Sequence, residues 1–247
     1  MLGRRGMVGL IVPSNNNVVL PEFYSALPKG ATAYETRMRV EGDLTAAAVH
    51  KMVDDAELAA ELLHQTGVDF ICYCCMASSI IKGLAWERAL LARFAHRAPK
   101  GVASANSALM DALRAIGAKR LALVTPYPEN LNALLPEFFA AEVFDVATIA
   151  GPQIRDVSAV RTLAPERLYA TARALALDRV DAISLLATDM ETFPVIEGIE
   201  RELGLPVVTS NQALLWATLR ALGIDDMVDG LGKLLRVASR AALRMGM

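Results

Sequence analysis

The sequence has little net charge, few aromatic residues and only three histidines. Its 25 lysine and arginine residues are balanced by 27 aspartate and glutamate residues, which leaves a net charge of −2. Proteins that bind nucleic acid depend on a basic surface that neutralises phosphates, so this balance predicts no nucleic-acid partner. The chain has 247 residues, of which 54% are hydrophobic and 21% charged. This composition is typical of a globular protein with a sizeable core.

Long apolar runs are absent from the amino end. The segment MLGRRGMVGLIVPSNNN begins with charged residues, and its apolar run stops at Pro13. Such a run is too short for the core of a signal peptide or for a membrane span, so we expect no membrane association. The three cysteines, Cys72, Cys74 and Cys75, lie within four positions. This spacing excludes a disulfide framework and suits a reducing compartment, so we expect a cytoplasmic protein.

Several motifs of known chemistry are missing. The sequence holds no G-x-G-x-x-G, no G-x-x-x-x-G-K-[ST], no H-E-x-x-H and no G-x-S-x-G, which removes the usual signatures of nucleotide binding, zinc proteases and elbow serines. A structural zinc site pairs two cysteines with a second pair of ligands. The cysteines here have no such pair, and His50, His64 and His96 have no ligand spacing. The sequence therefore predicts no metal site.

Instead, the chain reads as two similar halves. At an offset of 112 residues, VDFICYCCMASS (68–79) aligns with VDAISLLATDME (180–191), and GLIVPSN (9–15) aligns with ALVTPY (122–127). Each apolar run predicts a buried strand that ends in a loop. Helical patterns separate the strands, at 44–66, 86–96, 131–139, 165–177 and 193–203. This alternation is typical of parallel sheets covered by helices on both faces.

A third pair of segments completes the repeat. VASANSALMDALRAIG (102–117) and VVTSNQALLWATLRALG (207–223) both place Ser and Asn where they cap a helix and Gly where the helix ends. We predict an α/β fold of two pseudo-twofold-related Rossmann-like halves, with parallel sheets and the active site in the cleft between them. The first half is residues 1–111, joined by a C-terminal helix over 224–247 that packs on it, and the second half is residues 112–223.

The ends of the predicted strands locate the candidate site. Ligands of open parallel sheets bind beyond the carboxyl ends of the strands, which gathers the loops 13–17, 75–79, 126–130 and 187–191 into one cleft. Strand alternation turns Cys72 and Cys74 away from Cys75 and into the core. Cys75 stands at the strand end, where backbone N–H groups of the next helix can lower a thiol pKa. Cys75 is the candidate reactive thiol, with a third packed thiol as the alternative.

Polar side chains near the other strand ends can recognise a carboxylate. In the loop PSNNN, Ser14 and Asn16 are either hydrogen-bonding residues for such a group or simple turn residues. Tyr127 follows the matching strand of the second half, and it is either a packed aromatic or a donor into the cleft.

These residues resemble the aspartate/glutamate racemase superfamily, and within it the maleate cis-trans isomerase and arylmalonate decarboxylase group, over nearly the whole chain. GLIVPSNNNVVLPE is similar to the isomerase opening P-S-S-N-T, with Asn16 at the substrate-binding asparagine, and SNQALLWATLRALGI resembles the isomerase segment after the last strand. CMASSIIKG is closer to the decarboxylase segment G-T-S-L-S-F-Y-R-G, with Cys75 in place of its first glycine. Tyr127 falls where both families place a tyrosine against the substrate carboxylate.

The resemblance implies a cofactor-free enzyme that uses cysteines at one or both strand ends. Racemases and the isomerase have both cysteines and the decarboxylase has only the second, whereas this chain has Cys75 at the first position and Ala187 at the second. Racemisation is the least favoured reaction, because Ala187 can be neither acid nor base. Isomerisation resembles a covalent route in which a thiolate adds to the double bond, the new single bond rotates and the thiolate leaves. The nucleophile of that route sits at the position of Cys75.

The resulting prediction is a cofactor-independent isomerase of the maleate cis-trans isomerase type that acts on a small carboxylate or dicarboxylate. Cys75 is the predicted nucleophile, and the predicted substrate-binding residues are Ser14, Asn16, Met76, Ala77, Tyr127, Ala187 and Thr188. One alternative is an arylmalonate-type decarboxylase with Cys75 as the proton donor. Another is a catalytically impaired homologue that only binds a carboxylate. The resemblance also implies a homo-oligomer.

Overall fold

Four parallel strands form the first sheet of the computed structural model, which describes residues 2–40 and 46–236. The strands are β1 (Gly6–Pro13), β2 (Ala31–Met38), β3 (Phe70–Tyr73) and β4 (Val102–Ser104), in the order β2-β1-β3-β4. The central strands β1 and β3 are buried along nearly their whole length, which accounts for their continuous apolar sequence. Their register sets Leu10 opposite Cys72 and Ile11 opposite Tyr73.

The second sheet repeats the first. Its strands are β5 (Arg120–Val124), β6 (Asp145–Ala150), β7 (Ala182–Leu185) and β8 (Val207–Thr209), in the order β6-β5-β7-β8, and all its pairings are parallel. β7 lies 112 residues after β3, as the internal repeat predicts. The predicted fold of two similar α/β halves with parallel sheets is therefore confirmed.

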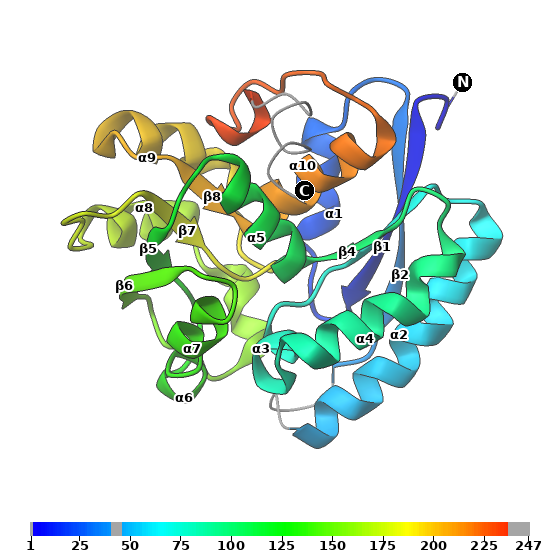
Figure 1. Cartoon of the computed structure of the whole chain (residues 1–247), viewed down its shortest axis with the longest axis horizontal. Helices are drawn as coiled ribbons and strands as arrows, with labels where there is room; N and C mark the ends of the chain where they lie inside the picture. Colours follow the sequence, from blue (N-terminus) through cyan, green and yellow to red (C-terminus); the bar gives the residue numbers. More distant parts are fainter. Residues whose placement is uncertain (1, 41–45, 237–247) are drawn as a thin grey trace.

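Helices cover the sheets (Figure 1). α2 and α4 lie on the outer side of the first sheet, and α8 and α9 lie beside the second. The α-helices are α1 (Val19–Ala26), α2 (Ala46–Thr66), α3 (Ala77–Lys82), α4 (Leu84–Phe94), α5 (Ala105–Ala115), α6 (Glu129–Asn132), α7 (Leu135–Ala140), α8 (Pro165–Arg173), α9 (Ile196–Leu203) and α10 (Ser210–Leu222). Short 3-10 helices are η1 (Ala95–Arg97), η2 (Val157–Thr162), η3 (Phe193–Val195) and η4 (Leu234–Arg236).

The two halves meet through α5 and α10, which pack against each other between the sheets (Figure 1). Both helices begin with a capping box: Ser104 pairs with Ser107 in α5, and Thr209 pairs with Gln212 in α10. These reciprocal hydrogen bonds fix where each helix leaves its strand. One hydrophobic core runs through this interface and joins residues of both sheets. The loops at the strand ends are thus held in a fixed arrangement.

Two sequence predictions about helices need correction. The predicted helix over 131–139 is two short helices, α6 and α7, because Pro136 has no backbone N–H group and is tolerated only in the first turn of a helix, where it stands in α7. Residues 224–233 are not helical, and η4 is the only regular turn within 224–236. Gly230 and Gly232 adopt positive φ there, which breaks a helix. The remainder of the predicted C-terminal helix, 237–247, lies outside the described residues.

The tail contacts both halves. Arg5 pairs with Asp226 on the first half, but the following segment binds the second half, where Arg236 pairs with Glu197 of α9 and the Gln212 side chain donates to the Leu231 carbonyl. The proposed division of the chain near residue 112 falls inside α5, and it stays a prediction.

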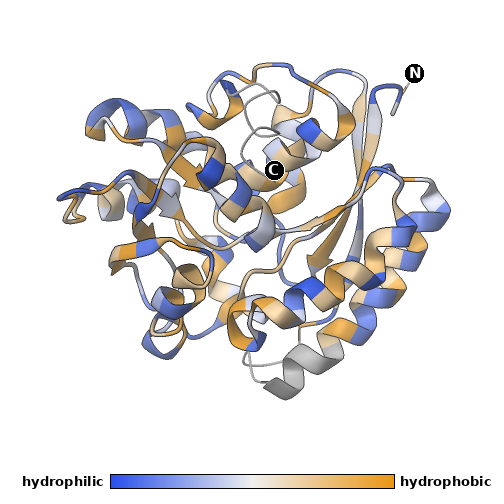
Figure 2. Ribbon diagram, viewed as in Figure 1, coloured by the Kyte–Doolittle hydropathy of each residue, from blue (hydrophilic) through white to orange (hydrophobic). Residues whose placement is uncertain are grey.

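The distribution of hydropathy follows the layers of the fold. Figure 2 shows hydrophobic strands in the interior and a mixture of hydrophilic and hydrophobic residues along the outer helices such as α2. None of the helices among the described residues is long and apolar enough to cross a membrane.

Candidate active site

One pocket collects the loops that follow the central strands of both halves. Pro13, Asn15 and Asn16 follow β1; Cys75, Met76 and Ala77 follow β3; residues 127–131 follow β5; and Thr188 and Asp189 follow β7. The pocket has a volume of about 960 Å³, at the upper end of the range for small-molecule sites. Further wall residues come from α3, α6 and the segment after β6, including Ile81, Leu134, Gln153, Arg155, Val157 and Val160.

Cys75 lies at the floor of this pocket, directly before α3. The Ser78 hydroxyl and the backbone N–H groups of Ser78 and Ala77 lie near its sulfur. The Ser78 hydroxyl is itself held by the Tyr73 hydroxyl at 2.9 Å. The predicted N–H donors are therefore present, and each lowers the thiol pKa.

The net effect on the Cys75 thiol is nevertheless a raised pKa. Burial is the largest cause, since only 6% of the residue is exposed, and removal from water disfavours a thiolate. The nearby Asp189 carboxylate raises the pKa further. The expectation of a lowered pKa is thus wrong, because the donors only partly offset burial.

The other two cysteines pack away from the pocket. Cys72 and Cys74 are fully buried in the core cluster shared by both sheets, whereas Tyr73 and Cys75 belong to the cluster under α2 and α4. This arrangement follows the alternation of side chains along β3. Burial raises the pKa of Cys72 to about 12 and holds that of Cys74 well above its ordinary value. Cys75 is therefore the one thiol that lines the pocket.

Tyr127 lies in the pocket wall next to Cys75 and Asp189. Its side chain is mostly buried, and burial, together with the charges of Asp189 and Cys75, raises its pKa well above 10. The hydroxyl thus stays protonated and can donate. Within the described part of the chain it has no hydrogen-bond partner, so the donor is free for a ligand.

Asn16 and Thr188 join the two halves at the pocket edge. The Asn16 amide donates to the Thr188 hydroxyl at 3.0 Å, and its oxygen accepts from the N–H groups of Val18 and Val19 at the start of α1. The Thr188 hydroxyl in turn donates to the Cys74 carbonyl at 2.9 Å. Both side chains line the pocket, but most of their hydrogen-bonding capacity already holds the loops together.

Two of the predicted binding residues are not among those that line the pocket. Ser14 is exposed, and its hydroxyl accepts from the Val40 N–H group, so its interpretation as a turn residue is the better one. Ala187 is buried behind the pocket wall, and its N–H group donates to the Ser210 hydroxyl at 3.1 Å. Met76 and Ala77, unlike Ser14 and Ala187, do line the pocket.

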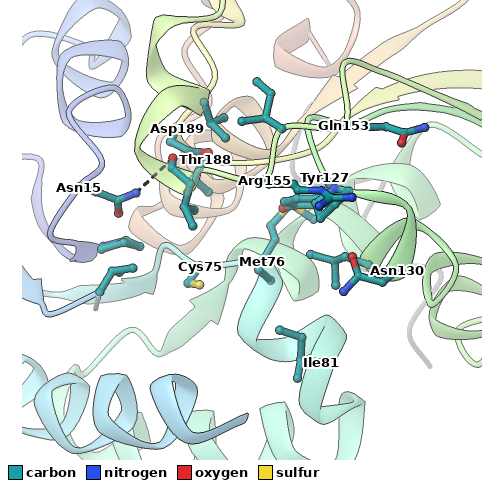
Figure 3. Close-up of a pocket in the computed structure, with 18 of the residues that line it drawn as sticks. Asn15, Cys75, Met76, Ile81, Tyr127, Asn130, Gln153, Arg155, Thr188 and Asp189 are labelled. Carbon is teal, nitrogen blue, oxygen red and sulfur yellow. Dashed lines mark hydrogen bonds between the residues drawn. The ribbon is translucent and has the colours of Figure 1, made fainter. Parts of the chain in front are cut away.

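Three charged residues of the pocket, Glu129, Arg155 and Asp189, were missed by the sequence interpretation. Figure 3 shows Asp189 beside Thr188, on the side of the pocket that faces Cys75, and Arg155 close to Tyr127. Asp189 lies inside the repeat segment VDAISLLATDME, so its position after β7 was a usable signal. Arg155 follows the edge strand β6, whose partly polar sequence has no clear strand pattern. No group of histidine, cysteine or acidic residues within 2–40 and 46–236 could hold a metal ion.

Comparisons with known proteins identify relatives of this chain. A family model for arylmalonate decarboxylase matches residues 8–235. The maleate isomerase of Nocardia farcinica (strain IFM 10152) is 30% identical over 239 residues, which cover 93% of this chain and 95% of that protein.

Solved structures of maleate isomerases share the fold. The enzyme Iso from Pseudomonas putida S16, with alanine in place of one cysteine and with maleate, is 30% identical and has a TM-score of 0.89. The cis-trans isomerase of Nocardia farcinica, a cysteine-to-serine mutant with a covalently bound succinylcysteine intermediate, is 29% identical and has a TM-score of 0.87. Each alignment covers 94% of this chain and 98% of the other.

Proposed function

We infer that this chain, which belongs to the arylmalonate decarboxylase family, is a cofactor-independent isomerase that converts a small cis-enedioate, with maleate as the type substrate, into its trans isomer. The observation that carries the proposal is the single pocket thiol, Cys75, which lies between the two halves with the Ser78 hydroxyl and the Ser78 and Ala77 N–H groups near its sulfur. Such donors stabilise a thiolate at the moment it attacks or leaves.

The reaction proceeds through the sulfur of Cys75. As the thiolate, it adds to one carbon of the double bond, which becomes a single bond and can rotate. The sulfur then leaves as the double bond re-forms in the trans arrangement, and the Ala77 and Ser78 N–H groups hold the charge that returns to it. The succinylcysteine intermediate of the Nocardia farcinica enzyme is the product expected from such an addition. That intermediate was obtained in a mutant lacking one cysteine, so one thiol suffices to form the adduct.

The carboxylates of the substrate meet donors on the pocket wall. The Tyr127 hydroxyl is a free donor near Cys75, and Arg155 brings a positive charge to the same side (Figure 3). The second amide hydrogen of Asn16 is the remaining donor at the opposite edge. A dicarboxylate bridging these groups is held at both ends while its central bond is left free to turn.

A second candidate reaction is decarboxylation of an arylmalonate, with Cys75 as the proton donor. The apolar wall formed by Ile81, Leu134 and Val160 favours it, because it can accommodate an aryl group. Loss of carbon dioxide from one carboxylate would leave a carbanion that the Cys75 thiol protonates.

One experiment separates these reactions. Purified protein is incubated with maleate and, separately, with phenylmalonate, and the products are followed by NMR in deuterated buffer. Conversion of maleate to fumarate supports the isomerase, and formation of α-deuterated phenylacetate supports the decarboxylase. Cys75→Ser removes either activity, because a hydroxyl is far harder to ionise than a thiol. A wild-type protein that converts neither compound contradicts both proposals.

The family resemblance also supports a homo-oligomer in the cytoplasm. The three cysteines are all free thiols, which is the state expected in a reducing compartment. Light scattering after size-exclusion chromatography measures the oligomeric state, and a monomeric mass contradicts the first part of this proposal.

A further inference from the structure

Ala187 leaves the second strand end without a thiol, but the same loop carries an acid into the pocket two residues later. Asp189 lines the pocket with Cys75 and Tyr127, and Figure 3 shows it on the facing side. Its side chain is half-buried. Among the described residues, only its own backbone N–H group donates to the carboxyl. The carboxyl group is therefore available to a molecule bound in the pocket.

The charges around Asp189 link it to Cys75. The Asp189 carboxylate raises the pKa of both Cys75 and Tyr127, which places its charge within electrostatic reach of the two groups. Arg161 of η2 is the positive charge that favours its ionised form, and Arg155 is a cation that lines the pocket. Because two adjacent negative charges repel, Cys75 and Asp189 together hold one proton more readily than none.

Burial raises the pKa of Asp189 to about 7. An acid–base residue is most effective when its pKa lies near the working pH, because both of its protonation states are then populated. An ordinary exposed aspartate would be ionised at neutral pH and could accept a proton but not readily donate one.

We propose that Asp189 is the acid–base residue of the isomerisation and takes the part that a thiol at position 187 would have. This inference rests on the proposed function of the same pocket. The proton of the Cys75 thiol passes to the Asp189 carboxylate, the sulfur bonds to one carbon of the double bond, and the π electron pair moves to the other carbon. That carbon takes the proton from Asp189.

The second half of the cycle reverses these transfers. The carbon–carbon bond that was the double bond is now single and rotates. The Asp189 carboxylate then removes a proton from the carbon that it had protonated, and the C–H electron pair re-forms the double bond. The sulfur–carbon bond breaks, and the sulfur leaves as a thiolate, which regains its proton from Asp189. No oxidant, reductant or further reactant is needed.

Asp189→Asn tests the proposal, because the amide keeps the shape but transfers no proton. We expect maleate isomerisation to fall by roughly 10²–10⁴-fold, the usual contribution of a general acid–base group. Alkylation of Cys75 by iodoacetamide at neutral pH should become faster, because the substitution removes the negative charge that raises the thiol pKa. The matched control is Glu191→Gln, which removes an exposed carboxylate from the same loop but outside the pocket lining and should change neither rate.

Slower turnover together with faster alkylation is the result expected if Asp189 acts on the proton of Cys75. Damage to the fold would slow turnover and also expose Cys72 and Cys74 to alkylation, which peptide mapping detects. Turnover of Asp189→Asn close to wild type, or alkylation that slows together with turnover, overturns the proposal. If wild-type protein does not isomerise maleate, the proposed function fails, while the alkylation rates still decide whether Asp189 controls the Cys75 thiol.

Discussion

Glu22 joins the two halves through a buried carboxylate, and its titration should make stability depend on pH. It lies in α1 of the first half, and its oxygens accept hydrogen bonds from the N–H groups of Thr192 and Phe193 and from the Asn211 amide in the second half. Burial nevertheless raises its pKa from 4.5 to about 7, outweighing these donors. The folded protein therefore binds this proton more tightly than the unfolded chain does.

The size of the effect follows from that difference in pKa. The stabilisation from the bound proton is fully present below about pH 4.5 and is lost as the pH rises through about 7. At 1.36 kcal/mol per unit, a difference of 2.5 units corresponds to about 3 kcal/mol. Glutamine at position 22 is neutral at every pH, so Glu22→Gln should remove this part of the pH dependence.

Urea denaturation at pH 5 and pH 8 measures the effect. The decrease in the free energy of unfolding between the two pH values should be smaller for Glu22→Gln than for wild type by about 2–3 kcal/mol. Comparing the two pH values cancels the altered contact of the new amide with Asn211. The surface substitution Glu137→Gln is the control and should keep the wild-type dependence. Equal pH dependence in wild type and Glu22→Gln would mean that Glu22 is ionised in the folded protein.

Four further substitutions test the pocket and the core beside it. Cys75→Ser should abolish turnover and leave the thermal unfolding midpoint within a few degrees of wild type. Cys72→Ser should lower that midpoint, because it changes a fully buried thiol. Activity kept in Cys75→Ser and lost in Cys72→Ser, with the calorimetric midpoint lowered in Cys75→Ser instead, contradicts the single-thiol assignment. Tyr127→Phe should raise the dissociation constant of a dicarboxylate roughly tenfold, since a hydrogen bond to a charged group is worth about 1.5–3 kcal/mol; unchanged affinity in calorimetry removes the hydroxyl from the site. Arg155→Gln should weaken the binding of maleate more than the binding of its monomethyl ester. An equal loss of affinity for both ligands shows that Arg155 recognises no second carboxylate.

The central part of the fold could be predicted from the sequence, and the edges could not. β1, β3, β5 and β7 are buried on both faces, so their apolar runs and the 112-residue offset between them were readable. β2 and β6 lie at the sheet edges, and their sequences, ATAYETRM and DVATIA, mix polar and apolar residues because most positions are only partly buried. Such strands have no periodicity that distinguishes them from loops.

The site divides in a similar way between local and long-range features. Alternation along β3 is local, and it correctly separates Cys75 from Cys72 and Cys74. The contacts that occupy Thr188 are not local, because its hydroxyl reaches the Cys74 carbonyl across 114 residues. Nothing in the sequence indicates that this hydroxyl is already used before a ligand arrives.

The internal repeat correctly located the end of the strand β7, but it directed attention to Ala187 and away from Asp189. At the offset of 112, Cys75 aligns with Ala187, so a comparison of equivalent positions finds a lost thiol and predicts an impaired enzyme. The structure has positive φ at Ala187, a backbone conformation that is rare for residues other than glycine, and the turn that follows brings Asp189 to the pocket. An acid with a pKa of about 7 can exchange a proton where a thiol is missing. A catalytic group is therefore better sought over the whole loop after each strand than at the single aligned position.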